Sequence, residues 1–437
     1  ARPDGASAIP RAQGDPSVLS LWSLALCCFA SAIVVVAAPA HADDGALDGV
    51  PVVSGPLTFE RALTLASQYQ LRLRAADLRA SASHERIRDA GRRPNPVLLG
   101  SGENFGGDLS DRLESTIEIA QTLELGGDRG ARSAVATGES RLASAEAAVL
   151  RRSILTDAAE RFARAWSLQE RLVRLREGEA LTRQAIDAAS ARYRAGASPV
   201  VERARAESQA LAQAVERQRT QAELLIARRD LAQTWGAEEA SFDSLLAPVP
   251  DRGSEVAPTL ASHPDLEQAS AVEELAAARR KSAEATRVPD VTLSGGVRHL
   301  EEVSGTGFVA SLEIPVPLWN RNGGSIDAAR REQEAAVAEK RAVSRRLDVE
   351  LRNAMERVQS AAAVYDTLTL RLRPARQDLV AELLRAYRAG RLSYLDLIAE
   401  QRFLLETDLA VVDAQANLWL SKMQLDLLTG TFPGGAR

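Results

Sequence analysis

The sequence predicts a mainly α-helical protein with a small β part, built from two copies of one unit. The first observation is compositional: 45% of the 437 residues are hydrophobic, yet only 4% are aromatic and 26% are charged. A chain rich in Ala, Leu, Glu and Arg is typical of long helices and coiled coils. The second observation is that residues 129–194 contain no proline. The third is an internal repeat, which organises the rest of the chain.

The repeat is visible in short motifs that recur after nearly the same number of residues. Residues 193–196 read Tyr-Arg-Ala-Gly, and the same tetrapeptide occurs at residues 387–390, a shift of 194. Pro94 recurs as Pro289, a shift of 195. Such agreement indicates a tandem duplication. The predicted domains are a first repeat over residues 57–236, a linker over 237–258, a second repeat over 259–430 and a tail over 431–437.

The N-terminal segment has an apolar run over residues 24–40, followed by the small-residue pattern Ala40-His41-Ala42. This pattern predicts a secretory signal peptide over residues 1–42, with cleavage after Ala42. A disordered segment is expected over residues 43–56. The alternative is a transmembrane anchor, which is less favoured because the run is short and Pro39 ends it.

Both cysteines, Cys27 and Cys28, lie inside the apolar run. A lipid-attachment motif requires a small residue before the cysteine, and Leu26 stands there, so a lipid anchor is not favoured. The mature chain would contain no cysteine, and therefore neither a disulfide nor a reactive thiolate.

Each repeat is predicted to begin with a helix, over residues 59–90 in the first and 265–286 in the second. Two stretches of alternating apolar and polar residues follow, as is typical of strands. Ile117 and Ile119, for example, share one face, and Glu118 lies on the other. The predicted strands cover residues 95–105 and 112–125 in the first repeat, and 290–300 and 307–318 in the second.

A long helical hairpin ends each repeat. The first is predicted over residues 129–235, and its outgoing helix would be ~100 Å long at 1.5 Å per residue. The second is predicted over residues 325–428, with a kink or local unwinding at Pro374. Helices of this length project from a compact domain, so their apolar positions need neighbouring helices for burial.

The strands match, in length and alternation, β-strands that cross a hydrocarbon layer of ~30 Å. Four strands cannot close a barrel, and open sheet edges are not tolerated in lipid. Oligomerisation resolves this, because three chains with four strands each would form a 12-stranded barrel above a helical tunnel. The alternative is a small soluble sheet that caps a coiled-coil stalk.

The duplicated unit of helix, two strands, long helix, turn and helix resembles the TolC-like outer membrane factors, the outer membrane efflux proteins. The resemblance covers residues 57–430. Residues 121–129 (QTLELGGDR) and 314–324 (IPVPLWNRNGG) are similar to the CzcC-type heavy-metal-efflux branch.

This resemblance implies a homotrimeric exit duct in the outer membrane lipid of a Gram-negative cell, with a periplasmic extension. It would dock with a periplasmic adaptor and an inner-membrane pump of the RND type, and would export divalent heavy-metal cations. The pump would supply the energy, so the chain itself is expected to be no enzyme.

The family places hydrogen-bonding tyrosines and an acidic ring at the closed periplasmic entrance. Related positions here recur in both hairpin turns, where Glu202 and Asp396 would supply two carboxylates per chain and favour cations. Two arginines of the second turn are expected to pair with these carboxylates across the hairpins. The predicted entrance and adaptor-docking residues are Tyr193, Gly196, Glu202, Tyr387, Arg388, Gly390, Arg391 and Asp396. The alternative is that the charged members are ordinary solvated helix ends.

Two glycine pairs follow the second strand of each repeat: Gly126 with Gly127, and Gly323 with Gly324. We expect them to form the strand-to-helix turns, with Pro315 ending the strand pairing. A phosphate-binding loop is not favoured, because the glycines are not part of a G-x-x-x-x-G-K-[ST] motif.

Other functions lack support in the sequence. A net charge of −5 provides no footprint for nucleic acid, and a mean hydropathy of −0.16 excludes a polytopic helical membrane protein. His84, His263 and His299 are far apart, so no metal site or cofactor is predicted. Two alternatives stay open: a multidrug or type I secretion channel of the same fold, and a periplasmic coiled-coil scaffold.

Overall fold

A computed structural model of the chain describes residues 49, 51–103, 114–246, 260, 263–300 and 305–430. The predicted signal peptide and the C-terminal tail lie outside these residues. The chain divides into the units Ala1–Gly49 and Val50–Arg437, and the described helices and strands all belong to the second unit. Within the described residues, no helix is both long and apolar enough to cross a bilayer.

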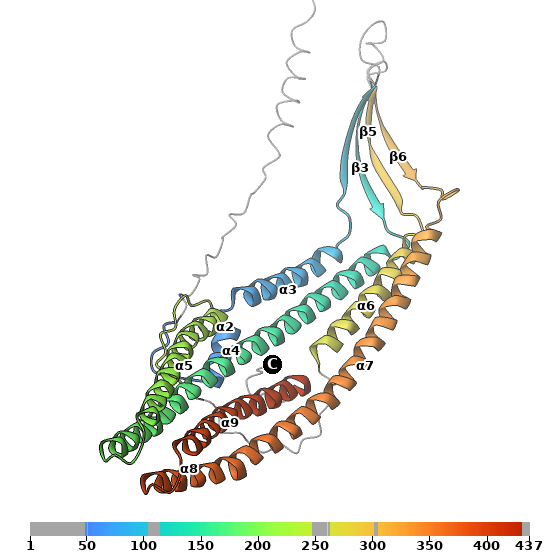
Figure 1. Cartoon of the computed structure of the whole chain (residues 1–437). Coiled ribbons are helices and arrows are strands. Elements are labelled where there is room, and N and C mark those ends of the chain that lie inside the picture. Colours follow the sequence, from blue (N-terminus) through green and yellow to red (C-terminus); the bar gives the residue numbers. More distant parts are fainter. Residues whose placement is uncertain are drawn as a thin grey trace, which may run out of the picture. The chain divides into compact units, whose positions relative to one another are not determined.

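Long helices dominate this unit, and four strands form a separate sheet at one end of them (Figure 1). The helices are α2 (Phe59–Tyr69), α3 (Leu71–Ala90), α4 (Asp128–Arg194), α5 (Val200–Ala232), α6 (Pro264–Ala285), α7 (Gly323–Thr367), α8 (Arg373–Arg388) and α9 (Tyr394–Thr429). The strands are β1 (Pro56–Thr58), β2 (Val97–Glu103), β3 (Glu114–Leu123), β4 (Ser244–Leu246), β5 (Val291–Leu300) and β6 (Gly305–Glu313).

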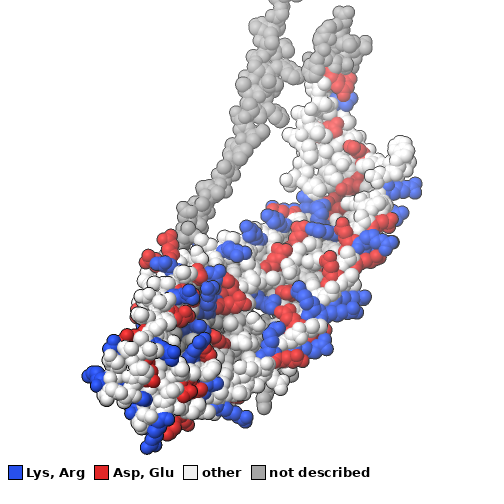
Figure 2. All heavy atoms as spheres, in the orientation of Figure 1, with Lys and Arg blue, Asp and Glu red and all other residues white. Residues whose placement is uncertain are grey.

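The four-stranded sheet is antiparallel in the order β2-β3-β5-β6, so the central pair joins the two repeats. Its two faces differ as the alternation predicts. Glu118 and Arg298 lie on the polar face, where Ser294 Oγ donates to Glu118 Oε2 over 2.6 Å and Arg298 Nη1 donates to Glu114 Oε2 over 3.0 Å. The opposite face exposes apolar side chains: Leu98, Ile117, Ile119, Leu293, Val297, Phe308 and Leu312. Uncharged atoms predominate over the strands, whereas charges of both signs cover the helices (Figure 2).

Two predicted elements end earlier than expected. The first helix is interrupted at Gln70, whose extended backbone (ψ 111°) ends α2 while its side chain caps α3. The last strand ends at Glu313, because Pro315 and Pro317 have no N–H groups for a ladder. The first difference depends on a tertiary contact of Gln70 with Thr234, and the second on the two prolines that follow the strand.

The predicted linker contains an element that the sequence analysis missed. Strand β4 pairs in parallel with β1, and this brings the start of the first repeat onto its own end. Leu245 and Phe242 are almost fully buried there. The ring of Trp235 lies 6.3 Å from that of Phe242, so part of the linker belongs to the core.

The main core lies where α2, α4 and α9 meet. The rings of Phe59, Phe162 and Trp419 form edge-to-face pairs with centroids 4.3 to 5.5 Å apart. Such pairs contribute beyond their buried area. The core therefore joins the first helix of repeat 1 to the last helix of repeat 2.

The outgoing helix of the second repeat is interrupted as predicted. Residues Leu368–Leu372 form a π-helical turn, η3, between α7 and α8, and Pro374 follows directly. Proline lacks an N–H group and its ring displaces the carbonyl four residues earlier, which accounts for the local change in pitch. The corresponding helix of the first repeat, α4, runs unbroken for 67 residues.

Candidate entrance at the hairpin tips

Both long hairpins turn at glycines with left-handed backbone conformations. Gly196 has a φ of 68° and Gly390 a φ of 76°, values that residues with a Cβ rarely adopt. Behind each glycine a backbone N–H closes the helix end: Ala197 donates to Arg192 O over 2.8 Å, and Arg391 donates to Ala386 O over 3.0 Å. The repeated tetrapeptide is thus a helix C-cap, which sets the two tips in the same conformation.

A hydrogen bond joins the tips of the two hairpins. The Tyr387 hydroxyl donates to Glu202 Oε2 over 2.9 Å, from the end of α8 to the start of α5. Tyr387 is fully buried, and its ring packs edge-on against Tyr394 with centroids 5.8 Å apart. Burial and the bond to Glu202 raise the pKa of Tyr387, so its hydroxyl stays a proton donor at any physiological pH.

Tyr394 is a member of this tip core that the sequence analysis missed. It is the first residue of α9, and burial raises its pKa to about 12. Its hydroxyl is buried and has no hydrogen-bond partner within the described part of the chain. The ring of Tyr394 therefore contributes to the tip through apolar packing between the hairpins. In sequence, a tyrosine just after a serine cap could have been recognised as the first residue of a returning helix.

Arg192 is the second residue that the sequence analysis missed, and it crosses between the repeats. Its Nη1 donates to Tyr387 O over 2.9 Å, its Nη2 donates to Ala197 O over 3.3 Å, and its guanidinium lies 4.6 Å from the Tyr387 ring centroid. Its repeat-related position holds Ala386. That difference, directly before the repeated tetrapeptide, was the available signal.

Asp396 has a local role in the structure. Ser393 Oγ donates to Asp396 Oδ2 over 2.6 Å, and the Asp396 N–H donates back to Ser393 Oγ over 3.4 Å. This reciprocal arrangement caps the N-terminus of α9. Although Glu202 and Asp396 hold the same repeat position, only Glu202 reaches the other hairpin within the described tip.

The remaining predicted tip residues are on the surface. Tyr193 is 42% exposed, and the Arg203 guanidinium lies 5.7 Å from its ring centroid. Arg388 and Arg391 are exposed, and among the described residues neither pairs with the two predicted carboxylates, which was the expectation. Arg388 instead lines a groove of about 350 Å³ between α4 and α8, with Gln184, Asp187, Ala188, Ala191 and Arg192.

The strand-to-helix turns occupy related positions in the two repeats, but the structure corrects which residue forms the second turn. Gly127 precedes α4 with a φ of 82°, and Asn322 precedes α7 with a φ of 58°. The left-handed residue of the second turn is therefore Asn322, whereas Gly323 and Gly324 are the first two residues of α7. Asn322 Nδ2 donates to Ala283 O over 2.9 Å, which holds the turn onto α6. Asparagine tolerates this conformation better than other residues with a Cβ.

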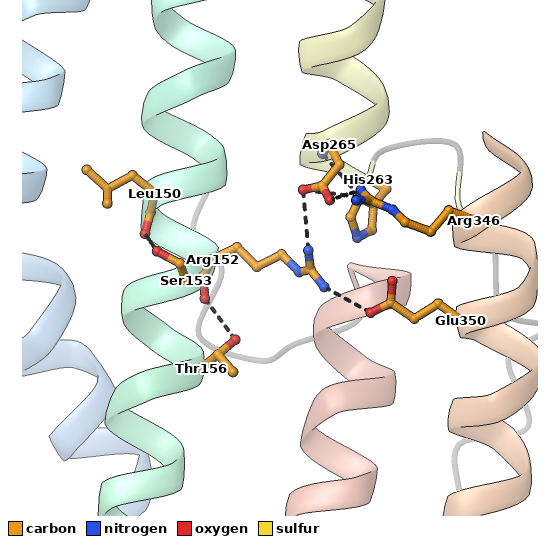
Figure 3. Close-up of polar contacts among 8 residues, drawn as sticks. All are labelled: Leu150, Arg152, Ser153, Thr156, His263, Asp265, Arg346 and Glu350. Atoms are coloured by element: carbon orange, nitrogen blue, oxygen red, sulfur yellow. Dashed lines mark hydrogen bonds and ion pairs between the residues drawn. The ribbon is translucent and has the colours of Figure 1, made fainter. Parts of the chain in front are cut away.

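A polar cluster around the buried His263 lies where the two repeats meet (Figure 3). His263 caps α6, because its Nδ1 accepts from the Asp265 N–H over 3.1 Å. Asp265 in turn accepts from Arg152 of α4 over 3.3 Å and from Arg346 of α7 over 2.8 Å. Arg152 also lies 3.8 Å from Glu350. Because arginines fill the space between the acids, the cluster is suited to joining helices and not to binding a cation.

No metal-binding constellation accompanies the tip. Among the residues that the structure describes, no group of three or more His, Cys, Asp or Glu side chains is arranged to hold a metal ion. The two hairpins contact each other at the tip through hydrogen bonds, an arginine stacked on a tyrosine ring and apolar packing, which suits a structural contact.

Comparison with known proteins shows similarity to a family of outer membrane proteins. The family model described as outer membrane efflux protein matches residues 257–431. The cobalt-zinc-cadmium resistance protein CzcC of Cupriavidus metallidurans is 28% identical over 390 residues, covering 86% of this chain and 91% of that protein. The match to the outer membrane efflux protein family covers the second repeat, and the similarity to CzcC extends over most of the chain. The nickel and cobalt resistance protein CnrC of the same organism is 30% identical, over 67% of this chain and 65% of CnrC.

Solved structures of outer membrane channels share the fold of this chain. The outer membrane protein VceC of Vibrio cholerae superposes with a TM-score of 0.73 at 19% identity, covering 85% of this chain and 96% of VceC. CusC superposes with a TM-score of 0.73 at 18% identity, covering 85% and 91%. The predicted fold class is therefore confirmed, including the duplicated hairpins and the four strands per chain.

Proposed function

We propose that the chain is the outer membrane exit duct of a tripartite efflux system that exports divalent metal cations. The single observation that carries the duct is the open sheet β2-β3-β5-β6, apolar on one face and hydrogen-bonded polar on the other. Its free edges need partners inside lipid. Three chains supply them by closing a 12-stranded barrel, with the helical hairpins forming a tunnel on the periplasmic side.

The choice of metal cations rests on the relatives. CzcC, the nickel-cobalt-cadmium resistance protein NccC and CnrC are each named for resistance to divalent transition metals. A conduit should release its cargo, and the absence of a metal-binding group among the described residues suits this role. Three copies of Glu202 around the entrance would attract cations and repel anions without holding either tightly.

The hairpin tips are proposed as the gate and as the docking site for a periplasmic adaptor. The Tyr387–Glu202 bond and the Arg192 bridge fix the two hairpins of one chain against each other. An adaptor hairpin that entered the groove lined by Arg192 and Arg388 would compete for these contacts. An inner-membrane pump of the RND type would supply cargo and energy, and this chain would perform no catalysis.

The test is genetic. Deletion of the gene should sensitise cells to zinc, cobalt, nickel or cadmium, and should leave sensitivity to dyes and detergents unchanged. Re-expression of the wild-type chain should restore growth on metal. Sensitivity to dyes and detergents alone would replace the metal assignment by a multidrug duct. Recovery of the mature chain as a soluble periplasmic monomer would refute the duct itself.

A further inference from the structure

The connection between β6 and α7, residues 314–322, leaves the sheet at the end where the long helices begin (Figure 1). Residues 311–321 are all exposed. The apolar side chains of this connection are among the most exposed of their kind: Val316 is 70% exposed, Leu318 61% and Trp319 94%. Exposed apolar side chains in one continuous stretch indicate a surface that a partner covers.

The first repeat shows that this exposure is specific to the second repeat. A shift of 195 residues relates Gly127 to Asn322, the left-handed residues of the two strand-to-helix turns. The same shift relates Glu124 to Trp319. The Glu124 side chain is only 8% exposed and forms an ion pair with Arg132 of α4. The first connection is therefore held against the helices by a buried acid, whereas the second presents a tryptophan to its surroundings.

A hollow of about 480 Å³ lies beside the second connection, between it and residues 286–290, which join α6 to β5. Asn322 ties the two walls together, because its Nδ2 donates to Thr286 Oγ1 over 2.7 Å. The guanidinium-bearing residues Arg287 and Arg321 line the hollow, together with Asn320 and several prolines, and the lining includes no carboxylate. The hollow therefore carries two positive charges that its own lining does not balance.

These two arginines differ from those nearby on the helices. Arg287 and Arg321 are exposed, and neither forms an ion pair within the part of the chain that the structure describes. Arg330 and Arg331 of α7, by contrast, each pair with an acid of their own helix. Figure 2 shows an uncharged protrusion at the base of the strands with Lys or Arg side chains next to it. Apolar groups beside free cations are typical of a surface that meets lipid headgroups.

We propose that this hollow binds the phosphodiester headgroup of an anionic phospholipid, with Leu318 and Trp319 among the upper parts of the acyl chains. Arg287 and Arg321 donate hydrogen bonds to the phosphate oxygens, because a guanidinium presents paired N–H groups that match phosphate geometry. A headgroup with net negative charge, such as phosphatidylglycerol, binds more tightly than phosphatidylethanolamine, whose ammonium group the two arginines repel. The inference rests on the proposed duct and adds a lipid site at its periplasmic rim.

The position of the hollow favours lipid over a soluble phosphate. Phe308 and Leu312 lie on the apolar face of β6. Ile314, Val316 and Leu318 continue the same alternation in sequence, up to the hollow itself. The apolar surface thus ends where the free cations begin, and tryptophan is enriched at this border between hydrocarbon and headgroups.

Trp319 serves as its own probe for acyl chains. The other described tryptophans, Trp166, Trp235 and Trp419, are buried in the helical core. The full-length protein is inserted into vesicles of phosphatidylglycerol whose acyl chains carry bromine near the headgroup. Bromine should quench wild-type emission, and Trp319→Phe should lose most of that quenching. Chains brominated near the bilayer centre should quench less. Unquenched emission in inserted trimers would show that a neighbouring copy covers the connection, and would overturn the inference.

Lipid affinity in detergent tests the headgroup site. The wild-type protein should bind phosphatidylglycerol more tightly than phosphatidylethanolamine. Arg287→Gln with Arg321→Gln should weaken phosphatidylglycerol binding about thirtyfold, because two cationic contacts are lost. The control pair, Arg330→Gln with Arg331→Gln, removes the same charge from exposed positions and should bind as wild type. Equal affinities of the two double variants would overturn the site. All four positions are exposed, so helix content by circular dichroism should not change.

Soluble phosphates distinguish the source of the ligand. Glycerol phosphate and inorganic phosphate have the same phosphate chemistry as the lipid but no acyl chains. Neither should displace phosphatidylglycerol when added at an equal concentration. Displacement by either would replace the lipid site by a site for a soluble phosphate.

The outcomes also separate the inference from the proposed function. A wild-type chain that inserts into vesicles as a trimer, but whose lipid affinity does not depend on Arg287 and Arg321, would overturn the lipid site and leave the duct standing. A wild-type chain that does not insert into vesicles and stays a soluble monomer would overturn both.

Discussion

The Tyr387 hydroxyl donates a 2.9 Å hydrogen bond to the Glu202 carboxylate, and this bond joins the hairpin tips of the two repeats across 185 residues of sequence. The repeat-related pair, Tyr193 and Asp396, forms no such bond within the described tip. Tyr193 is exposed, and Asp396 caps its own helix. The duplicated sequence therefore forms an asymmetric tip, in which the Tyr387–Glu202 hydrogen bond has no repeat-related equivalent. We call this hydrogen bond the latch.

Removal of the latch should open the entrance. In Tyr387→Phe the carboxylate of Glu202 loses its hydrogen-bond donor, while the packing of the ring is kept. The contact between the hairpins should lose about 1.5 kcal/mol of stability, the low end for a hydrogen bond to a charged group. The low end applies because Glu202 is only half-buried. We expect a higher single-channel conductance in planar bilayers. Tyr193→Phe is the matched control and should behave as wild type. Equal effects of the two substitutions would contradict the assignment of the latch to Tyr387.

Glu202 and Asp396 should separate by their effects. Glu202→Gln should reduce cation preference and raise conductance, because it removes the negative charge that contacts the opposite hairpin. Asp396→Ala should instead destabilise the start of α9 by ~1 kcal/mol, the usual cost of losing a helix cap. Reversal potentials and thermal unfolding measure the two effects. If Asp396→Ala changes ion selectivity as strongly as Glu202→Gln, Asp396 faces the aperture and the capping role is insufficient.

His263 should make the stability of the protein depend on pH. Burial, together with the nearby charge of Arg152, lowers the pKa of His263, although Asp265 and Glu350 act in the opposite direction. Below its ordinary pKa of ~6.5 the unfolded chain binds a proton that the folded chain resists. The free energy of unfolding should therefore fall as the pH is lowered from about 6.5 towards the depressed pKa of the folded protein.

The control for this effect is His263→Asn, which keeps a capping side chain and removes the titration. The difference in melting temperature between pH 8 and pH 5 should be smaller in this variant than in the wild type. An identical difference would show that other groups cause the pH dependence.

The glycines of the strand-to-helix turns should differ in their tolerance of a side chain. A Cβ on Gly126 would overlap the carbonyl oxygen of Ala285, whereas nothing lies within 4 Å of a Cβ on Gly324. Gly126→Ala should therefore reduce assembly or lower stability by a few kcal/mol, because backbone must shift to make room. Gly324→Ala should be neutral or slightly stabilising, since alanine favours a helix. Heat stability of the trimer on gels measures both, and a tolerated Gly126→Ala would contradict the packing at this turn.

Much of the fold could be predicted from the sequence, because most elements occur once in each repeat and their patterns could be compared. The long helix α4, the strand faces and the interruption near Pro374 follow from periodicity and from the properties of proline. The break at Gln70 and the pairing of β1 with β4 could not be predicted in this way. Both depend on contacts between segments far apart in sequence, such as the hydrogen bond from Gln70 Nε2 to Thr234 O.

The candidate entrance was predicted less completely. The turn glycines and Tyr387 follow from the repeated tetrapeptide, and the structure brings Tyr387 to Glu202. Arg192 and Tyr394 were missed because each matters through the other hairpin, which a pattern along one helix does not include. The pairing expected for Arg388 and Arg391 is not formed within the described tip, where Glu202 accepts from Tyr387 and Asp396 accepts from Ser393 instead.

Metal retention in living cells tests most directly whether the chain is the exit duct for divalent metal cations. Cells that lack the gene are loaded with zinc, cobalt or cadmium and transferred to metal-free medium, and the metal that remains is measured by mass spectrometry over time. We expect that deletion slows the loss of metal and that the wild-type chain restores it. Loss of all three metals at the wild-type rate in the deletion strain would contradict the assignment of this chain as their exit duct.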